Sequence, residues 1–181
     1  MTGSSTLAPA RPRLHVEPVG PEHWELGLSV VAAAQVSTGL PRSVAPQDLP
    51  NHVLERQRRA LGVWLAFACT PEGVTAVGHA LVLPVTPDHP VWGPVRDRAV
   101  AAALGAGRLA ELGGLAVSPG WTGLGVAREL VLARIGWLRR EGYAGCSSVW
   151  RDSPGSLRLA RSYGRPLPSA GSATHERFRY A

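Results

Sequence analysis

The sequence predicts a mixed α/β (α+β) fold, in which a mostly antiparallel sheet of six to seven strands carries helices on both faces. The first observation is composition: 45% of the 181 residues are hydrophobic and 18% are charged, which suits one domain with a real core. The second is the order of the expected elements, namely strand, helix, helix, three strands, helix, strand, helix and strand. Three consecutive strands predict an antiparallel meander, and the later strand–helix–strand unit predicts one crossover. A doubly wound nucleotide-binding fold would need several crossovers.

Alternation, turn residues and helix-starting residues place the elements of the first half. They are a strand over Leu14–Val19, a helix from Pro21 to about Ala34, a basic helix capped by Asn51 and ending at Arg59, and a hairpin of strands Gly62–Thr70 and Val74–Val85. The stretch Ser37–Pro50, rich in Pro and Ser, is expected to be a loop. Residues 1–12 are expected to be a disordered lead-in, and residues 13–181 a single domain.

The second half begins with an irregular insertion, Thr86–Gly107, that contains a short helix at Arg98–Leu104. The elements expected after it are a strand over Leu109–Val117, a loop Ser118–Gly125, a long helix Val126–Glu141, a strand Ala144–Trp150, a short helix Ser156–Tyr163 and a last edge strand Arg177–Tyr180. Gly142 is expected to stop the long helix, and Asp152 to cap the short one.

Charge and composition limit the functional classes. The net charge is +6, and every basic residue is arginine, so an anionic partner is favoured. The chain has no apolar run of about 18 residues, so no membrane span is expected. Its N-terminus lacks a basic start followed by an apolar stretch and is not expected to be a secretion signal. Cys69 and Cys146 are expected to be buried thiols in a reducing cytoplasm. The six histidines lack metal-ligand spacing, so no metal site is expected.

The segment Glu111–Leu130 carries the chemistry. It is a buried strand, a tight loop with three glycines, and then the long helix. Successive backbone N–H groups at such a turn converge at the positive end of the helix dipole and form an anion site that suits a pyrophosphate. Glycine-rich turns before helices are common, so a purely structural role of this turn stays open.

Two glycines inside the apolar strand strengthen the case for a ligand. Gly113 and Gly114 weaken strand pairing and predict a bulge that would splay the strand from its neighbour. By simple alternation, the Glu111 side chain lies on the same face as Gly113 and Leu115. A carboxylate in an apolar strand needs a partner or a purpose, and Arg108 and Arg151 are the candidate structural partners.

This segment resembles the acetyl-CoA-binding motif of the GNAT acetyltransferase superfamily, Arg/Gln-x-x-Gly-x-Gly/Ala after the fourth strand. The residues that stand in the motif are Thr122, Gly123, Leu124, Gly125, Val126 and Ala127. Gly125 and Ala127 match the two small positions, and Thr122 replaces the usual Arg or Gln. The downstream stretch Ser153–Gly164 resembles the family's Asn-x-x-Ala-x-x-x-Tyr-x-x-x-Gly, with Ser153, Ser156 and Ala160 in place of Asn, Ala and Tyr.

The resemblance implies a GNAT fold, splayed at the cofactor-binding strand, with acetyl-CoA or another acyl-CoA between Leu109–Val117 and Ala144–Trp150. Leu115 and Val117 would pair with the pantetheine arm, and the Leu115 amide would stabilise the oxyanion. The loop amides from Thr122 to Ala127 would hold the pyrophosphate, beside Ser153 and Ser156. Glu111 matches the position of a general base. Tyr163, one turn beyond Ala160, could replace the missing tyrosine that protonates the CoA thiolate.

Three functions remain open. The first is transfer of an acetyl group from acetyl-CoA to the amine of a small molecule. The second, motivated by Thr122 and Ala160, is a GNAT-fold protein that binds acyl-CoA without acetylating. The third is a basic nucleic-acid or ribosome-associated module, supported only by charge, including the clusters Arg56, Arg58, Arg59 and Arg158, Arg161, Arg165. A homodimer is also left open, and His52 and Trp64 lie where acceptor-side residues sit in the family.

Overall fold

A single seven-stranded sheet runs through the computed structural model, which describes residues 12–38, 44–92, 95–168 and 174–180. Of the expected lead-in, only Pro12 lies within the described residues. The strands are β1 Arg13–Val19, β2 Gly62–Thr70, β3 Gly73–Pro84, β4 Leu109–Val117, β5 Ala144–Trp150, β6 Arg165–Leu167 and β7 His175–Tyr180. Their order is β1-β2-β3-β4-β5-β7-β6. The pair β4–β5 is parallel and the other five pairs are antiparallel.

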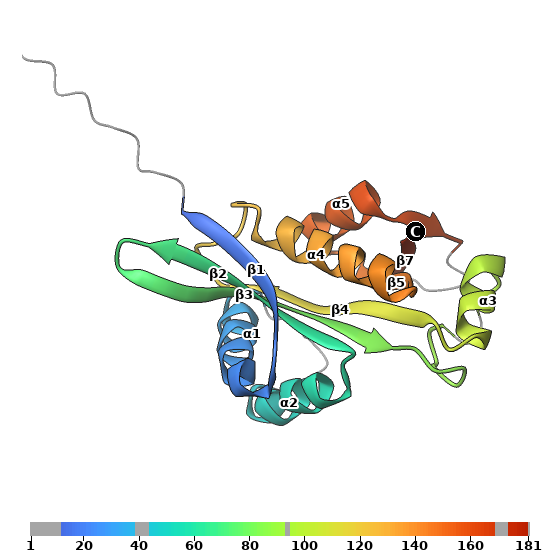
Figure 1. Cartoon of the computed structure of the whole chain (residues 1–181), viewed down its shortest axis with the longest axis horizontal. Helices are drawn as coiled ribbons and strands as arrows, with labels where there is room; N and C mark the ends of the chain where they lie inside the picture. The colour runs from blue at the N-terminus through green and yellow to red at the C-terminus, as the bar shows by residue number, and fades with distance from the viewer. Residues whose placement is uncertain (1–11, 39–43, 93–94, 169–173, 181) are drawn as a thin grey trace, which may run out of the picture.

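Helices cover both faces of this sheet (Figure 1). The helices are α1 Trp24–Thr38, α2 Leu49–Arg59, α3 Arg98–Gly105, α4 Val126–Glu141 and α5 Pro154–Tyr163, with short 3-10 turns at Pro21–His23 and Pro46–Asp48. Figure 1 shows α1 and α2 below the sheet, α4 and α5 above it, and α3 at one end. The predicted fold class, a mostly antiparallel mixed sheet with helices on both faces, is confirmed.

Several element boundaries differ from the prediction, and proline explains two of them. Helix α2 starts at Leu49 and α5 at Pro154, each with a proline in its first turn. Proline is tolerated there because the first N–H groups of a helix have no intrahelical partner. The predicted cap Asn51 therefore lies inside α2, and the N-cap of α5 is Ser153, not Asp152. Helix α1 continues past the expected end at Ala34 to Thr38, because no Gly or Pro stands between those two residues.

The C-terminal strand was expected at an edge, and this was wrong. Strand β7 pairs with β5 on one side and β6 on the other, so β6 is the edge strand. Strand β6 has three residues, including Pro166, and is too short to show alternation.

The main core fills the space between the sheet and α4. Its buried members include Ala66, Val82, Leu130, Ile135 and Phe178. Burial of these apolar side chains is the main term that holds α4 on the sheet. Cys146 is buried as expected, but Cys69 is exposed, because it lies near the end of β2 beside the β2–β3 turn. Among the described helices, none is long and apolar enough to cross a membrane.

Candidate active site

The parallel strands β4 and β5 separate after a short paired segment. Leu109, Ala110 and Glu111 pair with Ala144–Cys146, and no pairing continues beyond Glu111. A cavity of about 670 Å³ opens where the strands diverge. Its wall includes residues of β4, β5, α1, α2, α4, α5 and the loop before α4. The predicted splay at this strand is thus present, and it opens a site reachable from both faces of the sheet.

A bulge interrupts β4 beside this cavity. Leu81 pairs with Gly113, and His79 pairs with Ala116. An advance of two residues along β3 is therefore matched by an advance of three residues along β4. Gly114 has φ of +59°, a left-handed conformation that favours glycine. Leu115 has no register partner on β3, and the pairing with β5 has already ended. The bulge that the two glycines predicted is confirmed, and it takes the Leu115 amide out of the regular ladder.

The bulge also corrects the predicted facing of the side chains. Simple alternation put Leu115 on the Glu111 face, but the extra residue shifts the pattern after Gly113. Ala116 now shares the face of Glu111 and packs with Val31 and Val53 under α1 and α2. Leu115 packs against the core on the α4 side instead.

Two buried side chains hold the carbonyl groups of the bulge. His79 on β3 donates from Nδ1 to Gly114 O at 3.0 Å, while its Nε2 accepts from Gln57 Nε2 at 3.3 Å. Burial lowers the pKa of His79 to about 4, against a smaller opposing effect of the Gly114 hydrogen bond. The ring is therefore neutral at pH 7, and its two contacts define one tautomer.

Arg134 of α4 reaches the bulge from the other face. It is 1% exposed and donates to Leu130 O, Leu81 O and Gly113 O at 3.0–3.1 Å. Burial lowers its pKa to about 10, so the guanidinium stays charged at pH 7. Among the described residues no carboxylate pairs with it, and backbone carbonyls balance its charge. Sequence reasoning missed Arg134, although its place between Leu130 and Leu138 on the apolar helix face was a signal.

These contacts orient the peptide between Gly114 and Leu115. The C=O and N–H of a trans peptide point in opposite directions. Because Gly114 O is directed at His79, the Leu115 N–H points away from His79. Leu115 also lines the cavity. The backbone thus presents a donor at the bulge, as the oxyanion prediction requires.

The loop before α4 forms an open anion cradle. Gly120, Gly123 and Gly125 have φ of +82°, +79° and +91°. Gly125 is the N-cap of α4 and no side chain caps the helix, so the first N–H groups of α4 lack intrahelical partners. A Cβ on Gly123 or Gly125 would meet only open space. The residues fit the pyrophosphate of CoA, because donors, dipole and space coincide.

Most of the predicted cofactor residues lie around the cavity. The lining includes Leu115, Val117, Thr122, Gly123, Gly125, Val126, Ala127, Ser153 and Ser156, as well as Trp121 and Ala160. Leu124 is not in the wall and its side chain is 54% exposed. Trp64, which was expected on the acceptor side, is buried in the core against Trp137, whereas His52 lines the cavity.

Glu111 lies in the cavity wall on the α1–α2 side. Its side chain is 18% exposed, and its Oε2 is 4.0 Å from His89 Nε2. The two arginines that were expected as structural partners bond elsewhere: Arg108 to Glu141 O and Arg151 to Glu176. The carboxylate is thus accessible from the cavity.

Tyr163 lies away from the splay. Its hydroxyl accepts a hydrogen bond from Arg128 Nε at 3.0 Å, and it does not line the cavity. Its role as the acid for the thiolate stays a prediction. Tyr180 does line the cavity, with its hydroxyl 2.8 Å from Ser147 Oγ, and burial raises its pKa. Sequence reasoning missed Tyr180, because nothing local ties the last strand to this cavity.

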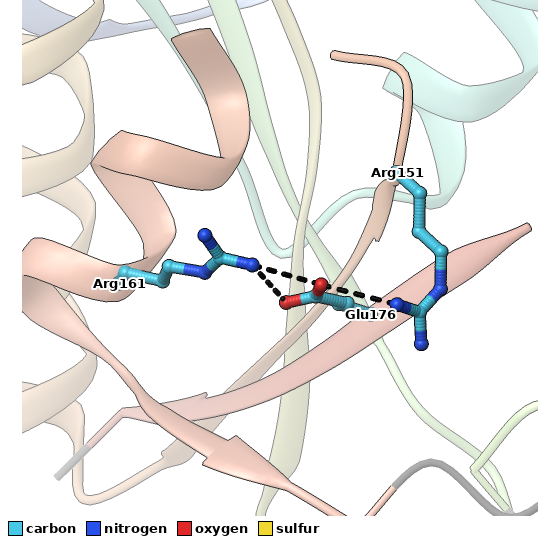
Figure 2. Close-up of polar contacts among 3 residues, drawn as sticks. All are labelled: Arg151, Arg161 and Glu176. Carbon is cyan, nitrogen blue, oxygen red and sulfur yellow. Dashed lines mark hydrogen bonds and ion pairs between the residues drawn. The ribbon is translucent and has the colours of Figure 1, made fainter. Parts of the chain in front are cut away.

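The second arginine cluster is partly engaged in an ion-pair network (Figure 2). Arg161 Nη2 lies 2.9 Å from Glu176 Oε1, and Arg151 Nη1 lies 3.3 Å from the same oxygen. This network joins α5 to β7 and to the turn that follows β5. Within the described part of the chain, no group of three or more His, Cys, Asp or Glu residues could hold a metal ion.

Comparison with known proteins shows the family of this chain. The Acetyltransferase (GNAT) family matches residues 34–164. That span is more than half of the chain, and the protein belongs to this family. It is therefore an acyltransferase. A search of curated proteins by sequence found no match.

Solved structures share the fold at low sequence identity. One is FeeM, an N-acyl amino acid synthase from uncultured soil microbes (13% identity, 93% of this chain and 91% of that chain, TM-score 0.66). Another is a GNAT acetyltransferase of Staphylococcus aureus Mu50 (12% identity, 93% of this chain and 98% of that chain, TM-score 0.63). A third is PaiA N-acetyltransferase of Thermoplasma acidophilum in complex with coenzyme A (15% identity, 93% of this chain and 99% of that chain, TM-score 0.59).

Proposed function

We propose that this acyltransferase transfers an acetyl group from acetyl-CoA directly to the amine of a small molecule. One observation carries the proposal: the Glu111 carboxylate and the Leu115 amide, which is out of the ladder, line the same cavity as the uncapped N-terminus of α4. A proton acceptor, an oxyanion donor and an anion cradle are the three parts that the reaction needs.

Each part has a defined task. Bound acetyl-CoA supplies a thioester carbon, to which the amine nitrogen bonds as the C–S bond breaks. Glu111 accepts the proton that the amine loses. The Leu115 N–H donates to the carbonyl oxygen as negative charge develops on it. A thiolate leaves tolerably well unassisted, so the proposal does not depend on Tyr163.

A small acceptor and a cytoplasmic location belong to the same proposal. Cys69 is a free, exposed thiol, which fits a reducing compartment. Pairing of Arg151 and Arg161 with Glu176 reduces the basic surface available to nucleic acid, and so favours a small molecule over the nucleic-acid alternative.

Glu111→Gln tests the base. The substitution keeps size and hydrogen bonding, so the acetylation rate is expected to fall about 10²- to 10⁴-fold, with unchanged acetyl-CoA affinity and melting temperature. The loss should shrink at high pH, where the acceptor amine is already neutral. Rate is followed by release of free CoA thiol over a panel of amines.

Glu25→Gln, at an exposed carboxylate in the first turn of α1, is the matched control and should keep the parent rate. A Glu111→Gln protein that loses stability but keeps its rate per folded molecule would make Glu111 structural. If the parent binds acetyl-CoA and turns over no amine, the alternative of CoA binding without transfer replaces the proposal.

A further inference from the structure

Arg56 of α2 lies directly over the bulge in β4. Its Nη2 is 2.8 Å from the position that a Cβ on Gly113 would occupy, so glycine there makes room for the guanidinium. Arg56 lines the same cavity as Glu111 and Leu115, and its side chain is half-buried. A fixed positive charge therefore stands beside the proposed base and the oxyanion donor.

This guanidinium has no direct partner in the described part of the chain. No described residue gives it a hydrogen bond or an ion pair within 4.0 Å, and Glu111 acts on it only through longer-range attraction. Burial lowers the pKa of Arg56, which reflects the loss of water around the group. A partly desolvated cation with unused donors gains most from an anionic ligand in the cavity.

The CoA phosphates would bind too far from Arg56 to be its anionic partner. Gly113 and the end of β4 at Val117 are separated by roughly 13 Å of strand, and the phosphate cradle follows beyond Val117. Arg56 also approaches from the α1–α2 face, whereas the cradle is the N-terminus of α4 on the opposite face. Its anion must come from the acceptor side.

We propose that the acceptor is an amino acid whose carboxylate binds Arg56 while its amine faces Glu111. This inference rests on the proposed function. A guanidinium fork matches a carboxylate in two parallel hydrogen bonds, and the pair of opposite charges in the wall matches a zwitterion. A polyamine would instead place a second cation against Arg56.

The rest of the acceptor side favours an apolar side chain. Val31 and Val53 line the cavity beside Ala116 on the Glu111 face of β4. His52, one turn before Arg56, has its pKa lowered by burial and by the Arg56 charge, so it is neutral at pH 7 and adds no competing cation. Leucine is therefore a suitable probe.

The test compares leucine with leucinamide and 3-methylbutylamine, which keep the amine and lose the carboxylate. Parent, Arg56→Gln, Arg56→Lys and Arg58→Gln proteins are assayed with acetyl-CoA for kcat and KM, with melting temperatures measured alongside. Arg58 is an exposed arginine of the same helix and serves as the matched control.

Loss of a hydrogen bond to a charged group lowers kcat/KM by about 10- to 150-fold. Arg56→Gln is expected to lose that factor in kcat/KM for leucine relative to leucinamide and 3-methylbutylamine, mainly through KM, because only leucine presents a carboxylate to Arg56. Arg56→Lys should restore part of the leucine rate, and Arg58→Gln should change nothing.

Three outcomes contradict the inference in distinguishable ways. Equal losses for leucine and leucinamide, or none for either, would show that Arg56 does not recognise a carboxylate, and the acetyltransferase function would stand. A parent protein that acetylates amines lacking a carboxylate but not leucine would overturn it equally. No acetylation of any amine would remove the proposed function, and this inference with it.

Discussion

Single residues hold the donor of this site in place. The carbonyls of Gly113 and Gly114 are bonded by Arg134 from one face of the sheet and by His79 from the other. The imidazole can play this part only in its neutral form with Nδ1 protonated, since Nε2 accepts from Gln57. Burial keeps it neutral by lowering its pKa to about 4.

The buried imidazole predicts a dependence of stability on pH. Because the pKa of His79 is lowered on folding, from 6.5 to about 4, the unfolded chain binds this proton more tightly. The stabilisation is complete above pH 6.5 and is lost as the pH falls toward 4, by about 3 kcal/mol. Denaturant unfolding at several pH values should show this loss in the parent.

His79→Asn separates His79 from the other titrating groups. The asparagine amide keeps a donor near Gly114 O but cannot be protonated, so the variant should have a flatter stability curve between pH 6.5 and 4. His15→Asn, at an exposed histidine of β1, should keep the parent curve. Parallel curves for the parent and His79→Asn would contradict this assignment.

At the scale of elements, the N-terminus of α4 is the decisive feature. Its N-cap is a glycine in a left-handed conformation, and no side chain satisfies its first N–H groups. Helix N-termini are usually capped by Ser, Thr, Asp or Asn, so an open end that faces a cavity is suited to an external anion.

Gly125→Glu is expected to abolish acetyl-CoA binding while the fold persists. The carboxylate would enter the cradle with the wrong charge, and the left-handed backbone would cost about 1–2 kcal/mol for a residue with a Cβ. Isothermal titration with acetyl-CoA measures the affinity, and circular dichroism checks the fold.

Gly142→Glu is the matched control at the other end of α4. Gly142 also has a positive φ, +71°, so the strain is similar, but it lies outside the cavity. This variant should bind acetyl-CoA as the parent does. Full binding by Gly125→Glu would show that the phosphate cradle lies elsewhere.

At the scale of the whole molecule, the two layers of helices contribute different parts of the cavity wall. In the proposed function, the α4–α5 side supplies the phosphate cradle and the α1–α2 side supplies the acceptor wall, and the gap between β4 and β5 joins them. Donor and acceptor can thus approach the bulge from opposite faces and meet only there.

This arrangement predicts that acetyl-CoA stabilises the entire domain. A ligand at about 100 times its Kd adds roughly 2.7 kcal/mol, which for a chain of this size raises the Tm by about 5–10 °C. Differential scanning fluorimetry with acetyl-CoA measures the shift. An unchanged Tm with every CoA ester at millimolar concentration would contradict the assignment of the cavity.

Local patterns in the sequence were enough to determine most elements and the glycine loop before α4. The bounds of β2, β4, β5 and α4 agree with the prediction, because alternation, apolar spacing and glycine punctuation act over a few neighbouring residues. The glycine pair in β4 predicted its bulge, and the three glycines before α4 predicted the tight loop there, for the same reason.

The tertiary structure alone decided which distant groups meet. The bulge reversed the facing of Leu115 and Ala116, β7 took an interior place in the sheet, and Tyr180 reached the cavity. Arg56 over Gly113 and His79 on Gly114 O are contacts between residues far apart in the chain. Such contacts arise when helices and strands pack, and packing depends on the shape and burial of whole surfaces, which no short stretch of sequence contains.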